Sequence, residues 1–186
     1  MTANYTLDQR HTESSPNGGS TSVGGGADLG GLGPEGLPSD NYNLRADWAH
    51  SFIPKHTFNS TVNARLPLGI FLTETMSFNN GRLYTITTGR DDNQDSSAND
   101  RPEGLGRNSE QGPNFLNFNF NISKAFFFGA ASGNTRKNIN LFANMTNAFN
   151  RPNYNPQSGV MTSPNFGKST SATAPREIEV GLRFQF

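Results

Sequence analysis

The sequence of 186 residues contains no cysteine and few hydrophobic residues. The absence of cysteine excludes a cysteine nucleophile but leaves the redox compartment open. Hydrophobic residues make up 32% of the chain, against about 45–50%, counting glycine, in ordinary soluble domains. The mean hydropathy is −0.64. A soluble domain of this length normally buries about two-thirds of its surface, and this composition argues against such a core.

An excess of charge of one sign is also missing, because 15 Lys and Arg balance 15 Asp and Glu. A neutral chain without a basic stripe is not expected to bind nucleic acid. No run of about 18 apolar residues occurs, which excludes a transmembrane helix. The first ten residues have no basic and no apolar region of the signal-peptide kind, so we expect any export signal to lie upstream of this chain.

Aromatic residues are plentiful in spite of the low hydrophobicity, with 15 Phe, 4 Tyr and 1 Trp. Disordered chains combine low hydrophobicity with few aromatic residues and a high net charge, and this chain has neither. A polar and aromatic composition is typical of a membrane β-barrel. Such a barrel has a polar lumen, polar loops, a thin outward apolar band and aromatic girdles at both interfaces.

Alternation of apolar and polar residues is the strongest periodic signal, and it recurs in segments of about 9–11 residues, the length of a barrel strand. Four such segments cover 58–66, 70–78, 116–122 and 139–145, and Tyr5 and Leu7 indicate the end of a further strand. Glu74 and Phe142 interrupt the alternation. The clearest segment is the C-terminus, whose apolar positions are Ile178, Val180, Leu182, Phe184 and Phe186.

The connections between these segments alternate in length. The long ones are 11–53, 89–113 and 150–175, and between them lie a tight turn at 66–69 and a shorter connection at 128–136. Bacterial outer-membrane barrels have short periplasmic turns and long extracellular loops. The sequence therefore predicts an all-β fold, an antiparallel transmembrane β-barrel segment of about six meander strands. In it, 11–53 is a long extracellular loop and 54–186 forms the final five strands.

A soluble β-sandwich also alternates and also has loops, so a secreted carbohydrate-binding sandwich stays open as an alternative. Its inward positions have to supply a core from both sheets. Here one face of the expected strands is almost entirely Asn, Thr and Ser, and long loops are uncommon in compact soluble domains. Both observations favour the barrel.

Seven short motifs occur in a defined order between residues 77 and 186. They are SFNNGRLYTITTGRD at 77–91, NDRP at 99–102, GRN at 106–108, NAFNRPN at 147–153, SPNFG at 163–167, APR at 174–176 and GLRFQF at 181–186. In order and spacing, from about Asp47 to the end, the chain resembles the C-terminal part of TonB-dependent receptors of the Oar-like group.

This resemblance implies the last strands of a barrel of about 22 strands, in the bacterial outer membrane. The parent protein is then expected to take up a scarce nutrient with energy supplied through TonB. The plug domain and the TonB-binding segment are expected to be absent from this chain, so TonB is a partner only through the missing N-terminal part. Other implied partners are outer-membrane lipid, the barrel assembly machinery and an unknown small-molecule or glycan ligand, with no cofactor. A non-transporting outer-membrane barrel, an adhesin or a structural protein, remains an alternative.

Motifs that would indicate a metal site or a catalytic site are weak in this sequence. Asp91, Asn93 and Asp95 place oxygen ligands at alternating positions, which suits Ca²⁺. The full calcium-loop signature also needs Gly at the sixth and Glu at the twelfth position, where this sequence has Ser96 and Pro102. A solvated turn explains the segment as well.

The three histidines, His11, His50 and His56, have no metal-ligand spacing, and no Ser/His/Asp set stands out. We therefore predict that the chain is not an enzyme.

The alternating C-terminal segment that ends in Phe186 is the strongest local motif. It resembles the signal by which the outer-membrane assembly machinery recognises its substrates. Physically, a terminal strand with one apolar face can pair edge-on with an open strand of that machinery. The alternative is an ordinary terminal strand without a recognition role.

Deletion of Phe186 separates the two interpretations. The deletion removes one residue from the end of the segment, so stability is expected to change little while assembly into the outer membrane falls. Assembly is followed by the heat-modifiable migration of the parent barrel on gels. Gln185→Ala is the control, because it leaves the apolar positions intact. Unchanged assembly after the deletion would contradict the recognition role.

Overall fold

The computed structural model describes residues 1–9, 11–12, 49–50, 52–94, 96, 98–132 and 135–186. In this part of the chain the fold is all-β with antiparallel sheets, as the sequence predicts. No helix among these residues is long and apolar enough to span a membrane.

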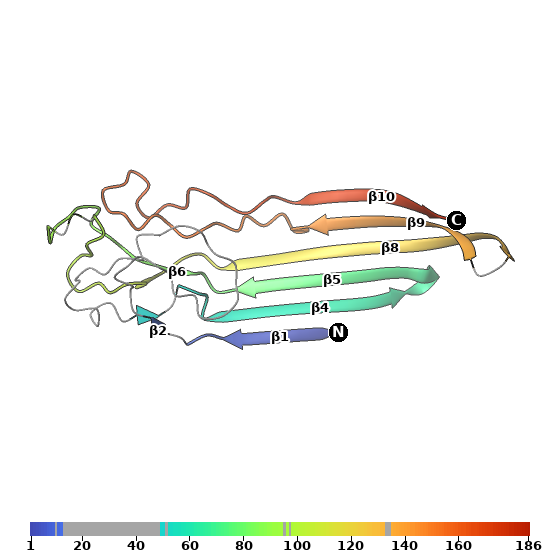
Figure 1. Cartoon of the computed structure of the whole chain (residues 1–186), viewed down its shortest axis with the longest axis horizontal. Coiled ribbons are helices and arrows are strands. Elements are labelled where there is room, and N and C mark those ends of the chain that lie inside the picture. The colour runs from blue at the N-terminus through green and yellow to red at the C-terminus, as the bar shows by residue number, and fades with distance from the viewer. Residues whose placement is uncertain (10, 13–48, 51, 95, 97, 133–134) are drawn as a thin grey trace.

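Six long strands form the main sheet, in the order β1-β4-β5-β8-β9-β10 (Figure 1). Each strand pairs with its neighbour in an antiparallel meander, and the sheet is open, with β1 and β10 at its edges. The strands are β1 (Thr2–Leu7), β4 (His56–Leu66), β5 (Ile70–Asn79), β8 (Phe115–Ser132), β9 (Thr135–Thr146) and β10 (Glu177–Gln185).

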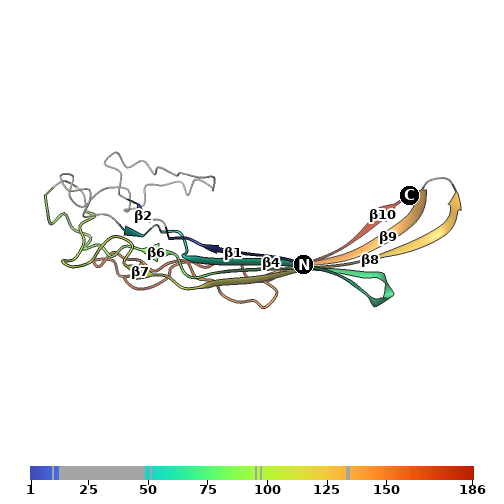
Figure 2. The same cartoon turned by 90° about the horizontal axis from the view of Figure 1, so that it is seen from below.

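Two small two-stranded sheets lie beyond one end of the main sheet (Figure 1). One pairs β2 (His11–Thr12) with β3 (Ala49–His50), and the other pairs β6 (Leu83–Tyr84) with β7 (Glu110–Gln111). The main sheet itself is strongly twisted, and Figure 2 shows the β4–β5 hairpin and the β8–β9–β10 segment bending away from each other.

The strand register gathers the apolar residues on one side of the main sheet, which we call the apolar face. Residues directly opposite in an antiparallel pair project to the same side. The apolar face therefore follows from rows of opposed residues across five strands. These rows are Val62, Glu74, Phe120, Met145 and Ile178; then Ala64, Leu72, Ile122, Ala143 and Val180; then Leu66, Ile70, Lys124, Leu141 and Leu182.

The opposite side, the polar face, is linked by side-chain hydrogen bonds along one row. Thr73 Oγ1 donates to Asn63 Oδ1 at 2.8 Å, which joins β5 to β4. Asn121 Nδ2 donates to Asn144 Oδ1, and Asn144 Nδ2 donates to Glu179 Oε2 at 3.0 Å. The two bonds of the Asn144 amide join β8, β9 and β10. Amide side chains, which carry both a donor and an acceptor, suit such a ladder.

The interruption of the alternation at Phe142 has a local explanation. Phe142 lies on the polar face directly opposite Gly181 on β10. A Cβ atom at position 181 would collide with the Phe142 ring. The glycine therefore leaves the space that the ring occupies.

Neither face has a buried apolar core. Among the residues whose burial the structure describes, no hydrophobic side chain is buried. Val180 is 67% exposed and Phe184 is 61% exposed, although both lie on the apolar face. The strands thus present a broad apolar surface, most of which no other described part of the chain covers.

Short and long connections lie at opposite ends of the main sheet (Figure 1). The predicted tight turn after β4 is confirmed as a 3-10 turn at Pro67–Gly69, in which Leu68 adopts a positive φ of 64°. The connections from β5 to β8 and from β9 to β10 lie at the other end. Most of the predicted loop 11–53 is outside the described residues.

The predicted connection at 128–136 is wrong in extent, because β8 continues to Ser132 and β9 begins at Thr135. Phe126, Phe127 and Phe128 lose the alternation but keep a high strand propensity, so the ladder continues past them. An irregularity in the register follows Phe128, where Gly129 has a φ of 79°.

Candidate functional site

Polar side chains, and not apolar ones, are buried at the end of the sheet that carries the long connections. The buried residues described there and at the adjoining strand ends are Thr87, Asn99, Asp100, Arg107, Asn108, Asn147 and Asn153. Buried polar groups are tolerated when they are hydrogen-bonded. The long connections are therefore organised by hydrogen bonds.

Thr87 ties the β5–β8 connection to the β9–β10 connection. Its N–H donates to Gly159 O at 2.9 Å, and its carbonyl accepts from Met161 N at 2.9 Å. The two segments form a short parallel bridge at Thr87 and Val160. Two loops that are far apart in the sequence are thereby joined into one unit.

Asn108 links the same connection to β3. Its Nδ2 donates to His50 O at 2.7 Å, and its N–H donates to Thr85 Oγ1 at 3.0 Å. The residue has a positive φ of 55°, a conformation that Asn adopts more readily than most residues. The GRN motif at 106–108 thus has a structural role in the loop.

The candidate calcium residues lie in a loop that its own carboxylates hold together. Asp91 Oδ2 accepts from Ser96 N at 2.9 Å, and Asp100 Oδ2 accepts from Asn93 N at 3.0 Å and from Asp92 N. Asp95 lies outside the described residues. Within the described ranges, no group of three or more His, Asp or Glu side chains is placed to hold a metal ion.

His56 makes a local side-chain contact. The Tyr5 hydroxyl and His56 Nδ1 are 2.7 Å apart in a hydrogen bond, and the two rings stack at 6.1 Å between centroids. His11 is opposite His50 in the β2–β3 register. That the chain is not an enzyme stays a prediction.

Among the residues that the structure describes, Tyr84 on β6 has a shifted acidity. Burial raises the pKa of its phenol, and the negative charge of Glu110 adds to this effect. A phenol is already protonated at neutral pH, and the raised pKa extends this protonated state to higher pH.

A turn built by Asn147 follows β9. Asn147 Oδ1 accepts from Arg151 N at 3.0 Å, and its Nδ2 donates to Arg151 O at 2.9 Å and to Ala174 O at 3.2 Å. Asn147 and Asn150 both have a positive φ, of 45° and 50°. The NAFNRPN motif at 147–153 therefore encodes a tight turn that is closed by one amide side chain.

Asn153 continues the β8 ladder where β9 has ended. Its Oδ1 accepts from Leu116 N at 3.0 Å, and its Nδ2 donates to Leu116 O at 3.0 Å. The side chain thus takes the place of a neighbouring strand, and Asn153 is only 2% exposed. Nothing in the alternation predicted this role.

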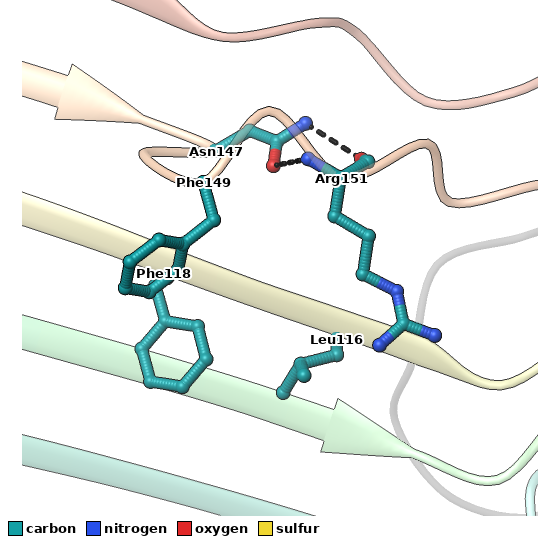
Figure 3. A pocket seen from close by; sticks show the side chains of 5 residues that line it. All are labelled: Leu116, Phe118, Asn147, Phe149 and Arg151. Atoms are coloured by element: carbon teal, nitrogen blue, oxygen red, sulfur yellow. Dashed lines mark hydrogen bonds between the residues drawn. The ribbon is translucent and has the colours of Figure 1, made fainter.

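A small cleft of about 200 Å³ opens between this turn and the outer end of β8 (Figure 3). It is lined by Leu116, Phe118, Asn147, Phe149 and Arg151, and we call it the aromatic cleft. The Phe118 and Phe149 rings meet edge to face, with 5.0 Å between their centroids. The sequence analysis missed this cleft. The resemblance pointed to 147–153 only as a motif, and its contact with β8 is long-range.

The proposed assembly signal lies on the edge strand β10. Ile178, Val180, Leu182 and Phe184 are all exposed, and Phe186 follows the strand with 91% of its surface exposed. The apolar positions are therefore accessible to an incoming strand in this structure.

The chain matches no family model, no curated protein and no solved structure. A proposal for its function therefore rests on the two faces of the sheet, the arrangement of its connections and the motifs of the sequence.

Replacement of Asn153 tests the role of its amide. Asn153→Ala leaves the N–H and C=O of Leu116 without their partner at a nearly buried position, so we expect a loss of about 2–4 kcal/mol. The thermal unfolding midpoint of the purified protein measures the effect. The matched control is Asn155→Ala, which removes an exposed hydrogen bond to Ser171 and is expected to cost about 0.5 kcal/mol. Equal effects of the two substitutions would contradict the proposed role.

Proposed function

We propose that the chain is the C-terminal wall of an outer-membrane β-barrel, and that the parent protein is a TonB-dependent transporter for energised nutrient uptake. The observation that carries the barrel is the uncovered apolar face of an antiparallel meander. The proposal of transport rests on the motifs between Ser77 and Phe186, which resemble those of TonB-dependent receptors.

The height of the apolar face fits a bilayer. From Leu116 to Phe126 the face covers ten residue steps of β8 (126 minus 116), or roughly 33 Å at about 3.3 Å per residue. Strands of membrane barrels are tilted by about 45°, which reduces this length to roughly 23 Å along the membrane normal. The apolar band of outer-membrane barrels is about 25 Å tall.

Two charged residues interrupt the apolar face between the rows of Leu116 and Phe126. Lys124 turns its ammonium group over the Phe126 ring, 4.8 Å from the centroid. Phe126 is one row nearer the short turns, so the charge is directed towards the edge of the band, as expected for a snorkelling lysine. Glu74 lies nearer mid-depth, where an acidic residue costs less than a basic one.

The polar face suits the lumen of a barrel. Its central row of Asn, Thr and Glu side chains is hydrogen-bonded across strands and exposed, which is the pattern of a wetted interior. The alternative fold, a soluble β-sandwich, needs a second sheet packed against the apolar face. The strands that the structure describes include no such sheet.

The two edges of the sheet require partners in a membrane. An unpaired strand edge in hydrocarbon leaves backbone N–H and C=O groups unsatisfied, at several kcal/mol each. The smallest barrels have about eight strands, so the edges of β1 and β10 are expected to pair with strands of the parent protein outside this chain. A non-transporting barrel needs the same closure and is distinguished by the absence of an upstream plug domain.

An arginine scan of β10 tests lipid exposure. If the apolar face contacts lipid, Val180→Arg, in the middle of the band, is expected to cost about 2–4 kcal/mol, and Phe184→Arg, at its edge, about 0–1 kcal/mol. Urea unfolding of the parent barrel in lipid vesicles gives both values. Glu177→Arg, at an exposed position on the polar face of β10, is the control and is expected to cost little. A penalty at Phe184 equal to that at Val180 would indicate burial in a soluble core.

Epitope tags test the sidedness of the connections. We expect a tag inserted at Gly104, in the β5–β8 connection, to be labelled on intact cells, because long loops of such barrels face the exterior. A tag at Leu68, in the short turn after β4, is expected to be labelled only after the outer membrane is permeabilised. The reverse pattern would overturn the proposed orientation.

A further inference from the structure

The aromatic cleft combines an apolar wall with a positive charge at one rim of the apolar face. Leu116 and Phe118 belong to successive rows of that face on β8, and Phe149 covers them from the turn after β9. Phe149 also meets Phe120 edge to face, at 6.3 Å between centroids. The wall of the cleft is thus continuous with the apolar band.

The positive charge comes from Arg151. In Figure 3 its guanidinium lies beside Leu116, towards the end of β5 from which the long connections begin, while the two phenylalanine rings lie farther along the strands. Among the residues that the structure describes, no carboxylate pairs with this guanidinium. The charge is therefore available to a ligand.

The turn presents Arg151 without using its side chain. Asn147 hydrogen-bonds through its side chain to the backbone N–H and C=O of Arg151, and its own backbone N–H donates to Asn119 Oδ1 on β8 at 3.1 Å. The backbone of Arg151 is consequently held at a fixed place beside the aromatic rings. A substitution of the side chain leaves the turn intact.

We propose that the aromatic cleft binds a phosphorylated lipid of the outer leaflet. One acyl chain lies against Phe118 and Phe149, and the lipid phosphate pairs with the Arg151 guanidinium. This inference rests on the proposed barrel function, because that function places the apolar face in lipid and the long connections outside.

The chemistry of the cleft matches the order of groups in such a lipid. The rings occupy the first rows of the apolar band, where acyl chains begin, and the guanidinium lies on the side of the loops, where headgroups lie. Arginine binds phosphate in a bidentate manner, with greater geometric specificity than lysine. Phe149 is 68% exposed, so an acyl chain would cover an aromatic surface that the described residues leave open.

Native mass spectrometry of the full-length parent protein, with lipid A as the probe, tests the inference. We compare the wild type with Arg151→Gln and Phe149→Ala at equal lipid concentration. Loss of one charge-assisted contact is expected to lower the bound fraction of lipid A about tenfold in Arg151→Gln. Arg151→Lys is expected to retain part of the binding. Arg183→Gln, a charge removal at an exposed position on the polar face, is the matched control and is expected to bind as the wild type does.

The outcomes separate this inference from the proposed function. Wild-type binding by Arg151→Gln in a protein with normal heat-modifiable migration would overturn the lipid site and leave the barrel standing. Equal loss in Arg151→Gln and Arg183→Gln would also overturn it, because the effect would then follow net charge. A wild-type protein that is recovered in soluble form without detergent would overturn the barrel itself.

Discussion

The register of the antiparallel ladder is the constraint on which the other features depend. Because side chains alternate with a period of two, a shift of one residue would exchange the apolar and polar faces of a whole strand. The polar row fixes this register directly, since Asn144 bonds to a residue on each neighbouring strand. A sheet with no buried core obtains its alignment from paired amides and from the backbone ladder.

Asparagine carries a large share of this organisation, for a physical reason. Its amide has one acceptor and two donors, like a displaced peptide group, and it tolerates a positive φ better than most side chains. Asn153 uses the first property to pair with both backbone groups of Leu116. Asn147 uses both properties, closing a turn in which its own φ is 45°. The polar composition that argues against a soluble core thus supplies the contacts that organise the sheet and its connections.

The sequence predicted the strands well because alternation is a local signal. The segments around Ile122, Ala143 and Val180 were placed on the correct strands, and their shared face follows from the register. The extent of β8 was missed, because three consecutive phenylalanines break the alternation while still favouring a strand. The loop contacts were also missed. Thr87 with Gly159, and Asn153 with Leu116, join residues far apart in the chain, and no periodicity encodes such pairs.

Because Leu116 pairs with a side chain, its backbone amide is protected from hydrogen exchange by a different contact from the amides deeper in β8. Its amide proton is shielded by a loop residue, whereas the amides deeper in β8 are shielded by the neighbouring strands β5 and β9. A fluctuation that lifts the segment around Asn153 therefore exposes Leu116 to deuterium exchange without separating any strands. Hydrogen exchange at this one amide then reports local opening of the loop, while exchange at Ile122 reports opening of the sheet.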